Sequence, residues 1–176
     1  LDADSGLFSP DFRSHERLGQ LLTQVAGRSG RGSMAGKVIL QTHQPDHPLL
    51  TVLTQQSYGD YSKLLRKQRK QSQLPPYKQL VLVRADAAHA QNAEAFLQSA
   101  RQCAEAISPS GDTVNYLGPL PALMERRNSR HRYVLQISGG RRSDLNVLLS
   151  QLMFELEKLP MARHVRWGVD VDPQEL

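Results

Sequence analysis

The 176-residue sequence has little cysteine, few aromatic residues and no long apolar run. Its single cysteine, Cys103, excludes an internal disulfide framework and a four-cysteine zinc site within this chain. No apolar run approaches the roughly 18 residues that a membrane-spanning helix needs. The segment LDADSGLFSPDF is acidic and shows neither a basic region nor a cleavage site, so we expect no secretory signal. These absences favour a cytoplasmic protein that is not inserted in a membrane.

Positive charge is present in excess. The 22 Lys and Arg residues outnumber the 17 Asp and Glu residues, which gives a net charge of +5. Between Asp60 and Lys78 six basic residues accompany a single acidic one. A second basic cluster lies within residues 126–132 and contains Arg126, Arg127, Arg130, His131 and Arg132. Such clusters either contact the phosphates of a polyanion or form a solvated surface, and charge alone leaves both open.

Hydrophobic periodicity predicts different structures on the two sides of Pro75-Pro76. Before the prolines we expect an amphipathic helix over about 14–25, a glycine-rich loop over 27–36, a strand over 37–41 and two further helices. The second of these is the basic segment DYSKLLRKQRKQSQ, with an apolar stripe of Tyr61, Leu64 and Leu65. After the prolines we expect strands over 80–84, 113–117, 133–137 and 165–171, and helices over about 93–107 and 143–156, the latter capped by Ser143.

The order β-α-β-β-α-β in the second half is the split βαβ plan, in which two helices cover one face of a four-stranded antiparallel sheet. We therefore expect an α+β domain of ferredoxin-like type. The connection GPLPALMERRNSRHR between the second and third strands is longer than a hairpin needs. Its length predicts a loop that takes part in docking or binding.

The sharpest chemical signal is QVAGRSGRG, which begins at Gln24 and places Arg28 and Arg31 among glycines. Glycine allows a ligand to approach the backbone closely, and a guanidinium offers phosphate oxygens a planar fork of donors. An arginine that reaches the γ-phosphate from a second lobe can accelerate phosphoryl transfer by about 10³ to 10⁵. A glycine- and arginine-rich surface loop is the alternative for the arginine pair alone, and Gln24 raises the specificity of the motif.

This segment resembles motif VI of superfamily-two helicases. The flanking PDFRSHER, the QTH after the expected strand and the terminal WGVDVDP are similar to the PriA family of primosomal replication-restart helicases. The resemblance covers essentially the whole chain and implies an α/β protein of three parts. These are the end of a second RecA-like helicase lobe over 1–50, a basic helical connector over 51–76, and a βαββαβ domain similar to a ribosomal-protein fold over 77–176.

The resemblance also implies the activity of the longer protein. It would be an ATP-dependent 3′-to-5′ DNA helicase that recognises stalled or abandoned replication forks and starts primosome assembly. This chain lacks a GxxxxGK[ST] loop, a DExH-type motif and the family's cysteine-rich insertion, so we expect it to be a C-terminal segment that is inactive alone. ATP with Mg²⁺ would be bound mostly by upstream residues, and zinc only by the full-length protein, with no metal in this segment.

The family's partners imply further sites. They are branched or forked DNA, the acidic C-terminal tail of single-stranded-DNA-binding protein and other primosome proteins, around a monomer in the bacterial cytoplasm. Motif position implies that Arg31 is the arginine finger, with Arg28 second, and that Gln24, Gly27 and Gly30 lie at the nucleotide. The DNA-binding candidates are Lys63, Arg66, Lys67, Lys70, Arg127 and Arg130. Arg142, at a helix start after Gly139-Gly140, is the candidate for the acidic tail, with a solvated surface arginine as the alternative.

Other residues with chemical potential favour structural roles. His43 and His47 are spaced as metal ligands on a helix would be, but Pro45 and Pro48 favour a loop with ordinary polar histidines. We expect Cys103 and Trp167 to be core residues. The basic clusters and the βαββαβ order, taken without the motif, would also suit a non-enzymatic nucleic-acid-binding or ribosome-associated module.

Overall fold

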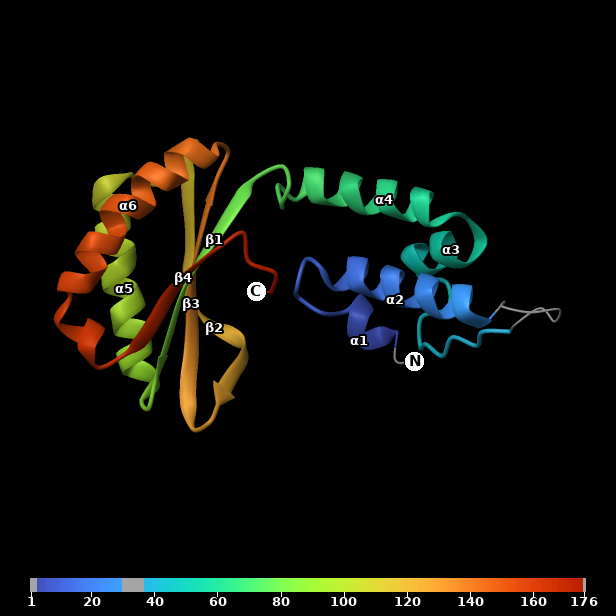
Figure 1. The fold of residues 1–176 in the computed structure, drawn as a ribbon, viewed down its shortest axis with the longest axis horizontal. Coiled ribbons are helices and arrows are strands. Elements are labelled where there is room, and N and C mark those ends of the chain that lie inside the picture. The colour runs from blue at the N-terminus through green and yellow to red at the C-terminus, as the bar shows by residue number, and fades with distance from the viewer. Residues whose placement is uncertain (1–2, 30–36, 176) are drawn as a thin grey trace. The chain divides into compact units, whose positions relative to one another are not determined.

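The computed structural model describes residues 3–29 and 37–175, and Figure 1 shows its helices and strands. Contacts between residues divide the chain into two compact units. The first consists of Leu1–Ser72 with Glu175, and the second of Gln73–Gln174 with Leu176. In the described part of the chain, no helix combines the length and the apolar character that a membrane crossing requires.

The first unit is helical. Its elements are α1 (Asp4–Leu7), α2 (Ser14–Ser29), α3 (Pro48–Gln55) and α4 (Tyr58–Gln71). The side chain of His47 accepts a hydrogen bond from the backbone N–H of Leu49 at 3.3 Å, and Ser57 caps α4 in the same way through Asp60 N–H at 3.1 Å. The buried core of the described part consists of Ala3, Leu7, Leu18, Leu22, Leu49, Leu50, Tyr61 and Leu65.

The three longer helices of this unit confirm the periodicity, and two details differ from it. Helix α2 continues to Ser29, so Gly27 and Arg28 are helical rather than part of a loop. The strand expected over 37–41 is wrong, because residues 37–40 form no strand and Gln41 makes only an isolated bridge. A strand requires a hydrogen-bonded neighbour, and the described part of this unit contains no strand to provide one.

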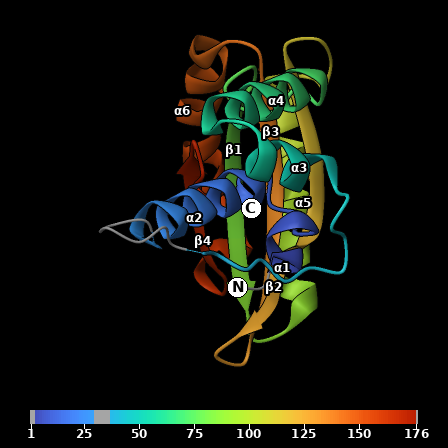
Figure 2. The same cartoon turned by 90° about the vertical axis from the view of Figure 1, so that its right-hand side faces the viewer.

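The second unit confirms the expected β-α-β-β-α-β order. Its elements are β1 (Gln79–Ala87), α5 (Ala90–Ile107), β2 (Val114–Arg127), β3 (Arg130–Gly139), α6 (Arg142–Lys158), the 3₁₀ helix η1 (Pro160–Arg163) and β4 (Arg166–Val171). The strands form one open antiparallel sheet in the order β2-β3-β1-β4. Helices α5 and α6 cover the same face of this sheet (Figures 1 and 2).

The core of the second unit lies between this sheet face and the two helices. Alternate residues of β1, from Val81 to Ala87, face the helices and are buried. Trp167 packs against Phe96 with ring centroids 5.6 Å apart, which confirms it as a core residue, and Cys103 is partly buried at the edge of the same core. Leu80 and Leu82 on the other face of β1 are buried as well, as expected of a central strand.

The connection expected to be a loop is instead a long hairpin. Strand β2 continues to Arg127, and Asn128 and Ser129 turn the chain with φ values of 51° and 60°. Two residues with positive φ form the turn whose twist fits an antiparallel hairpin. The register shifts after Leu117 and Pro121 accommodate the prolines of this edge strand. The Asn-Ser pair was the overlooked signal, because the Gly and Pro residues before it indicate a loop.

Gly118 permits the first of these irregularities. Its φ is +110°, and a Cβ at this position would lie 2.8 Å from the carbonyl oxygen of Val134. Its own carbonyl accepts a hydrogen bond from the Arg101 guanidinium at 2.7 Å. This hydrogen bond joins the hairpin, at Gly118 of β2, to helix α5. At the start of α6, the expected cap by Ser143 is wrong: Arg141 is the N-cap residue, and the Ser143 hydroxyl bonds Asp144 at 3.0 Å.

Candidate nucleotide and nucleic-acid sites

The first half of α2 packs closely against α4. The ring of Tyr61 is fully buried, and its hydroxyl donates to the backbone carbonyl of His15 at 2.5 Å. A Cβ at Gly19 would lie 2.3 Å from Cε1 of Tyr61, so only glycine allows this approach. Burial raises the pKa of Tyr61 to about 12, which keeps the hydroxyl protonated and able to donate.

Charged side chains add to this packing. Arg69 of α4 pairs with Glu16 at 2.7 Å, and its guanidinium lies 5.3 Å from the centroid of the Phe12 ring. Arg17 pairs with the buried carboxylate of Asp11 at 3.2 Å. Arg69 therefore belongs to the structure of the unit, although the sequence groups it with the other basic residues of α4.

The second half of α2 is exposed and carries the start of the QVAGRSGRG motif. Gln24, Gly27 and Arg28 are all exposed, and no hydrogen bond or ion pair joins the Arg28 guanidinium to another residue of the described part. Gly30 and Arg31 lie outside the described residues. The arrangement presents an unpaired guanidinium at the end of a helix whose beginning packs into a core, which suits an anionic ligand.

The segment after the motif returns to α1. The Thr42 hydroxyl donates to the carboxylate of Asp4, and the backbone N–H and ring Nδ1 of His43 donate to it at 2.9 and 2.7 Å. These hydrogen bonds, that of Thr42 above all, lower the pKa of Asp4 to about 2. His47 caps α3, so both histidines have the polar roles that the prolines favoured. Nowhere in residues 3–29 and 37–175 do three potential metal ligands of the His, Cys, Asp or Glu types gather.

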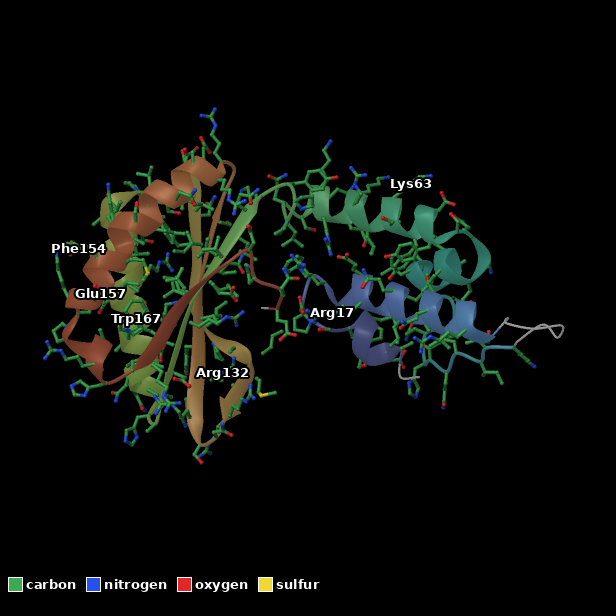
Figure 3. All side chains as sticks on the ribbon, viewed as in Figure 1. Arg17, Lys63, Arg132, Phe154, Glu157 and Trp167 are labelled. Atoms are coloured by element: carbon green, nitrogen blue, oxygen red, sulfur yellow. The ribbon has the colours of Figure 1, made fainter. Side chains whose placement is uncertain are left out.

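The outward face of α4 is basic. Tyr61 and Leu65 are buried and Leu64 packs beside them, as the apolar stripe predicts. The DNA-binding candidates on this helix are all exposed, namely Lys63, Arg66, Lys67 and Lys70. Lys63 pairs with Asp60 at 2.9 Å, yet its side chain keeps 79% of its exposure (Figure 3). Hydrogen bonds from the Ser57 hydroxyl and from Lys63 lower the pKa of Asp60.

The remaining basic candidates lie in the second unit. Arg127 is exposed at the end of β2, next to the hairpin turn. Arg130 instead donates to the backbone carbonyl of Asp86 at 2.8 Å and lies 3.3 Å from its carboxylate, with only 24% of its side chain exposed. Arg142 is 67% exposed and lies 3.4 Å from Asp172. Arg127 and Arg142 are thus accessible, whereas Arg130 is already engaged by Asp86 of the neighbouring strand β1.

The structure also gathers charged residues that sequence reasoning did not single out. Arg84 and Arg166 lie with Arg132 on the sheet face that α5 and α6 leave uncovered. Arg84 donates to the carboxylate of Asp170 at 3.0 Å, across neighbouring strands. The alternation of charged and apolar residues within RADA (84–87) and RWGVDV (166–171) could have assigned Arg84 and Arg166 to one face of each strand. Only the strand register shows that these faces lie together.

The second unit combines a four-stranded antiparallel sheet with helices on one face, and comparison with known proteins gives the family of the chain. Residues 70–174 match the family model described as primosomal protein N C-terminal domain, and the chain belongs to this family. It is 38% identical over its whole length to the replication restart protein PriA of Haemophilus influenzae. It is 31% identical over 98% of its length to that of Bacillus subtilis, and 36% identical over 97% to that of Synechocystis.

These relatives are much longer than the chain. The matches span 24% of the Haemophilus protein, 21% of the Bacillus protein and 20% of the Synechocystis protein. The resemblance to the PriA family is therefore confirmed for a segment of about a fifth to a quarter of such a protein. The match to all three relatives includes the first unit, which the family model leaves largely uncovered.

Proposed function

We propose that the chain is the C-terminal segment of an ATP-dependent 3′-to-5′ DNA helicase that recognises stalled or abandoned replication forks and starts primosome assembly. The observation that carries this proposal is the similarity to replication restart proteins over the whole chain, with the QVAGRSGRG segment inside it. In this proposal the end of a RecA-like lobe covers residues 1–50 and the basic connector covers residues 51–76, so the connector includes the first four residues of the second unit. The second unit is the ferredoxin-like, ribosomal-protein-like terminal domain.

The motif would act on ATP that is bound, with Mg²⁺, mostly by residues upstream of this chain. Arg31 would be the arginine finger and Arg28 a second cation, with Gln24, Gly27 and Gly30 beside the nucleotide. The guanidinium of Arg28 at the end of α2, which is exposed and has no partner within the described ranges, supports this role. Since the arginines gain a strong ligand only when ATP lies against them, hydrolysis would be coupled to closure of two lobes. Zinc would belong to the upstream part of the protein.

The exposed basic residues would contact DNA and protein partners. The outward face of α4 and Arg127 near the hairpin turn would bind the phosphates of branched DNA. Arg130 would contribute a further phosphate contact from the part of its side chain that Asp86 leaves exposed. Arg142, which is 67% exposed, would receive the acidic tail of single-stranded-DNA-binding protein. Other primosome proteins would assemble on this monomer in the bacterial cytoplasm.

The test is arginine replacement in the full-length protein. Arg31→Ala should lower DNA-stimulated ATP hydrolysis by about 10³ or more, because the charge that develops on the γ-phosphate loses its cation. DNA affinity, measured by fluorescence anisotropy, should stay close to that of the unmodified protein. Arg163→Ala, which removes an exposed arginine of η1, is the matched control and should leave hydrolysis unchanged. Unchanged turnover in Arg31→Ala would reject the finger assignment.

A further inference from the structure

The sheet face opposite α5 and α6 contains a cavity of about 220 Å³ within the second unit. Its charged lining comes from three adjacent strands. Asp86 of β1 lies directly opposite Arg132 of β3 on one side and Arg166 of β4 on the other. Arg84 lies two residues from Asp86 on the same face and also lines the cavity. Three guanidinium groups therefore surround one small hollow.

Two of the three arginines have no partner among residues 3–29 and 37–175. Arg84 is held by Asp170 at 3.0 Å. Asp86 is held by Arg130, which lies 3.3 Å from its carboxylate. For Arg132 and Arg166, by contrast, no hydrogen bond or ion pair to any residue of the described ranges is found. Both flank Asp86, and after these pairings they leave the cavity with an uncompensated charge of two guanidinium groups.

The cavity also has a glycine in its wall. Gly168 lies opposite Arg84, and a Cβ at this position would meet no atom within 4 Å. A ligand can therefore reach the backbone of β4 without hindrance from a side chain. Trp167, the residue before Gly168, turns to the helix side, whereas Arg132 lies on the other side of the sheet (Figure 3).

We propose that this cavity binds a phosphate group of a nucleic-acid strand, held between the guanidinium groups of Arg132 and Arg166. A guanidinium matches two phosphate oxygens with two parallel N–H donors, and two such forks facing one hollow favour a phosphate over a single carboxylate. Only the source of the phosphate, a DNA strand, rests on the proposed function. Arg127 at the far end of the same hairpin would contact the strand beyond the cavity.

The phosphate site can be tested on the 176-residue chain with inorganic phosphate as the probe. In NMR titrations of the ¹⁵N-labelled chain, phosphate should shift the Gly168 amide and the Nε signals of Arg132 and Arg166. Arg132→Gln/Arg166→Gln should lose the Gly168 shift, and the corresponding double lysine variant should retain part of it because it keeps the charges but lacks the forks. In Arg163→Gln, which removes one positive charge outside the cavity, phosphate should shift the Gly168 amide as it does in the unmodified chain.

A second variant removes the space and keeps every charge. Gly168→Leu places an apolar side chain in the cavity, and since its Cβ meets nothing, the fold should be retained. Phosphate binding should be lost while the dispersed amide spectrum remains. The proposal is overturned if phosphate causes no shift in the unmodified chain. It is also overturned if the shifts are unchanged in both the double glutamine variant and Gly168→Leu.

The source of the phosphate is decided with a short single-stranded oligonucleotide. The oligonucleotide should displace inorganic phosphate. The double glutamine variant should reduce the slope of log K against log salt concentration by about 0.7, because the two arginines together hold one phosphate of the strand. An acidic peptide that shifts Gly168 as strongly as the oligonucleotide would overturn the nucleic-acid assignment, as would phosphate binding that the oligonucleotide leaves untouched. None of these measurements uses ATP, so their failure is distinct from failure of the Arg31→Ala hydrolysis test.

Discussion

The carboxylate of Asp4 connects α1 to Thr42 and His43, two residues of the QTH segment. Because these hydrogen bonds lower its pKa from 3.8 to about 2, the charged carboxylate stabilises the folded state fully above pH 3.8 and loses that contribution as the pH falls to about 2. Asp4→Asn should therefore lower the melting temperature of the first unit at pH 7. By circular dichroism, the difference from the unmodified chain should shrink below pH 3.8 and vanish near pH 2.

The control for Asp4 is Asp46→Asn, which neutralises an exposed carboxylate without a hydrogen bond in the described part of the chain. It should leave the melting temperature unchanged at every pH. A difference between Asp4→Asn and the unmodified chain that persists undiminished at pH 2 would contradict the role assigned to this carboxylate.

Tyr61 is the other residue whose hydroxyl links two elements. Tyr61→Phe removes the hydrogen bond from the hydroxyl to the His15 carbonyl, which should lower the free energy of unfolding by about 0.5–1.5 kcal/mol in urea titrations. Tyr58→Phe, at a partly exposed ring, should change it by less than about 0.5 kcal/mol. Since burial raises the pKa of Tyr61 to about 12, its contribution is full below pH 10 and is lost as the pH rises through 12. Equal effects of the two substitutions would refute this account.

At the scale of elements, two glycines of α2 have opposite surroundings. At Gly19 an added methyl group would meet the Tyr61 ring at 2.3 Å, so Gly19→Ala should destabilise the first unit by about 1–3 kcal/mol. At Gly27 an added methyl group meets nothing within 4 Å, so Gly27→Ala should stabilise the helix by about 0.5–1 kcal/mol. Urea unfolding followed by far-ultraviolet circular dichroism measures both. A destabilising Gly27→Ala would mean that α2 does not extend through the motif.

Hydrophobic periodicity predicted the helices and strands whose apolar residues mark a buried face. It failed where strand register or the chemistry of a turn determines the structure. The continuous apolar run of β1, the alternation of β4 and the apolar stripes of α5 and α6 were sufficient to predict these strands and helices. The hairpin was missed because Gly118, Pro119 and Pro121 indicate a break, whereas register shifts absorb them within a strand. The same limit applies to sites: the engagement of Arg130 by Asp86 follows from register, which composition and charge do not contain.

At the scale of the whole molecule, the two units differ in the size of their cores. Within the described residues the second unit has a core of 19 buried hydrophobic residues, and the first has only eight. The first unit also exposes Phe8, Leu21 and Ile39, and contains an apolar cavity of about 410 Å³ beside Leu22 and Leu53. A core this small is expected of a segment that completes a larger lobe.

This difference in core size predicts how two fragments of the chain, cut after Ser72, should unfold. A fragment of residues 73–176 retains the sheet, both of its helices and their core, so it should unfold cooperatively by circular dichroism. A fragment of residues 1–72 has a much smaller core, so it should unfold at a lower temperature and over a broader range than the longer fragment, and should bind a dye for exposed apolar surface. A sharp transition in the shorter fragment would show that the first unit is complete in itself, and would count against its being the end of a larger lobe.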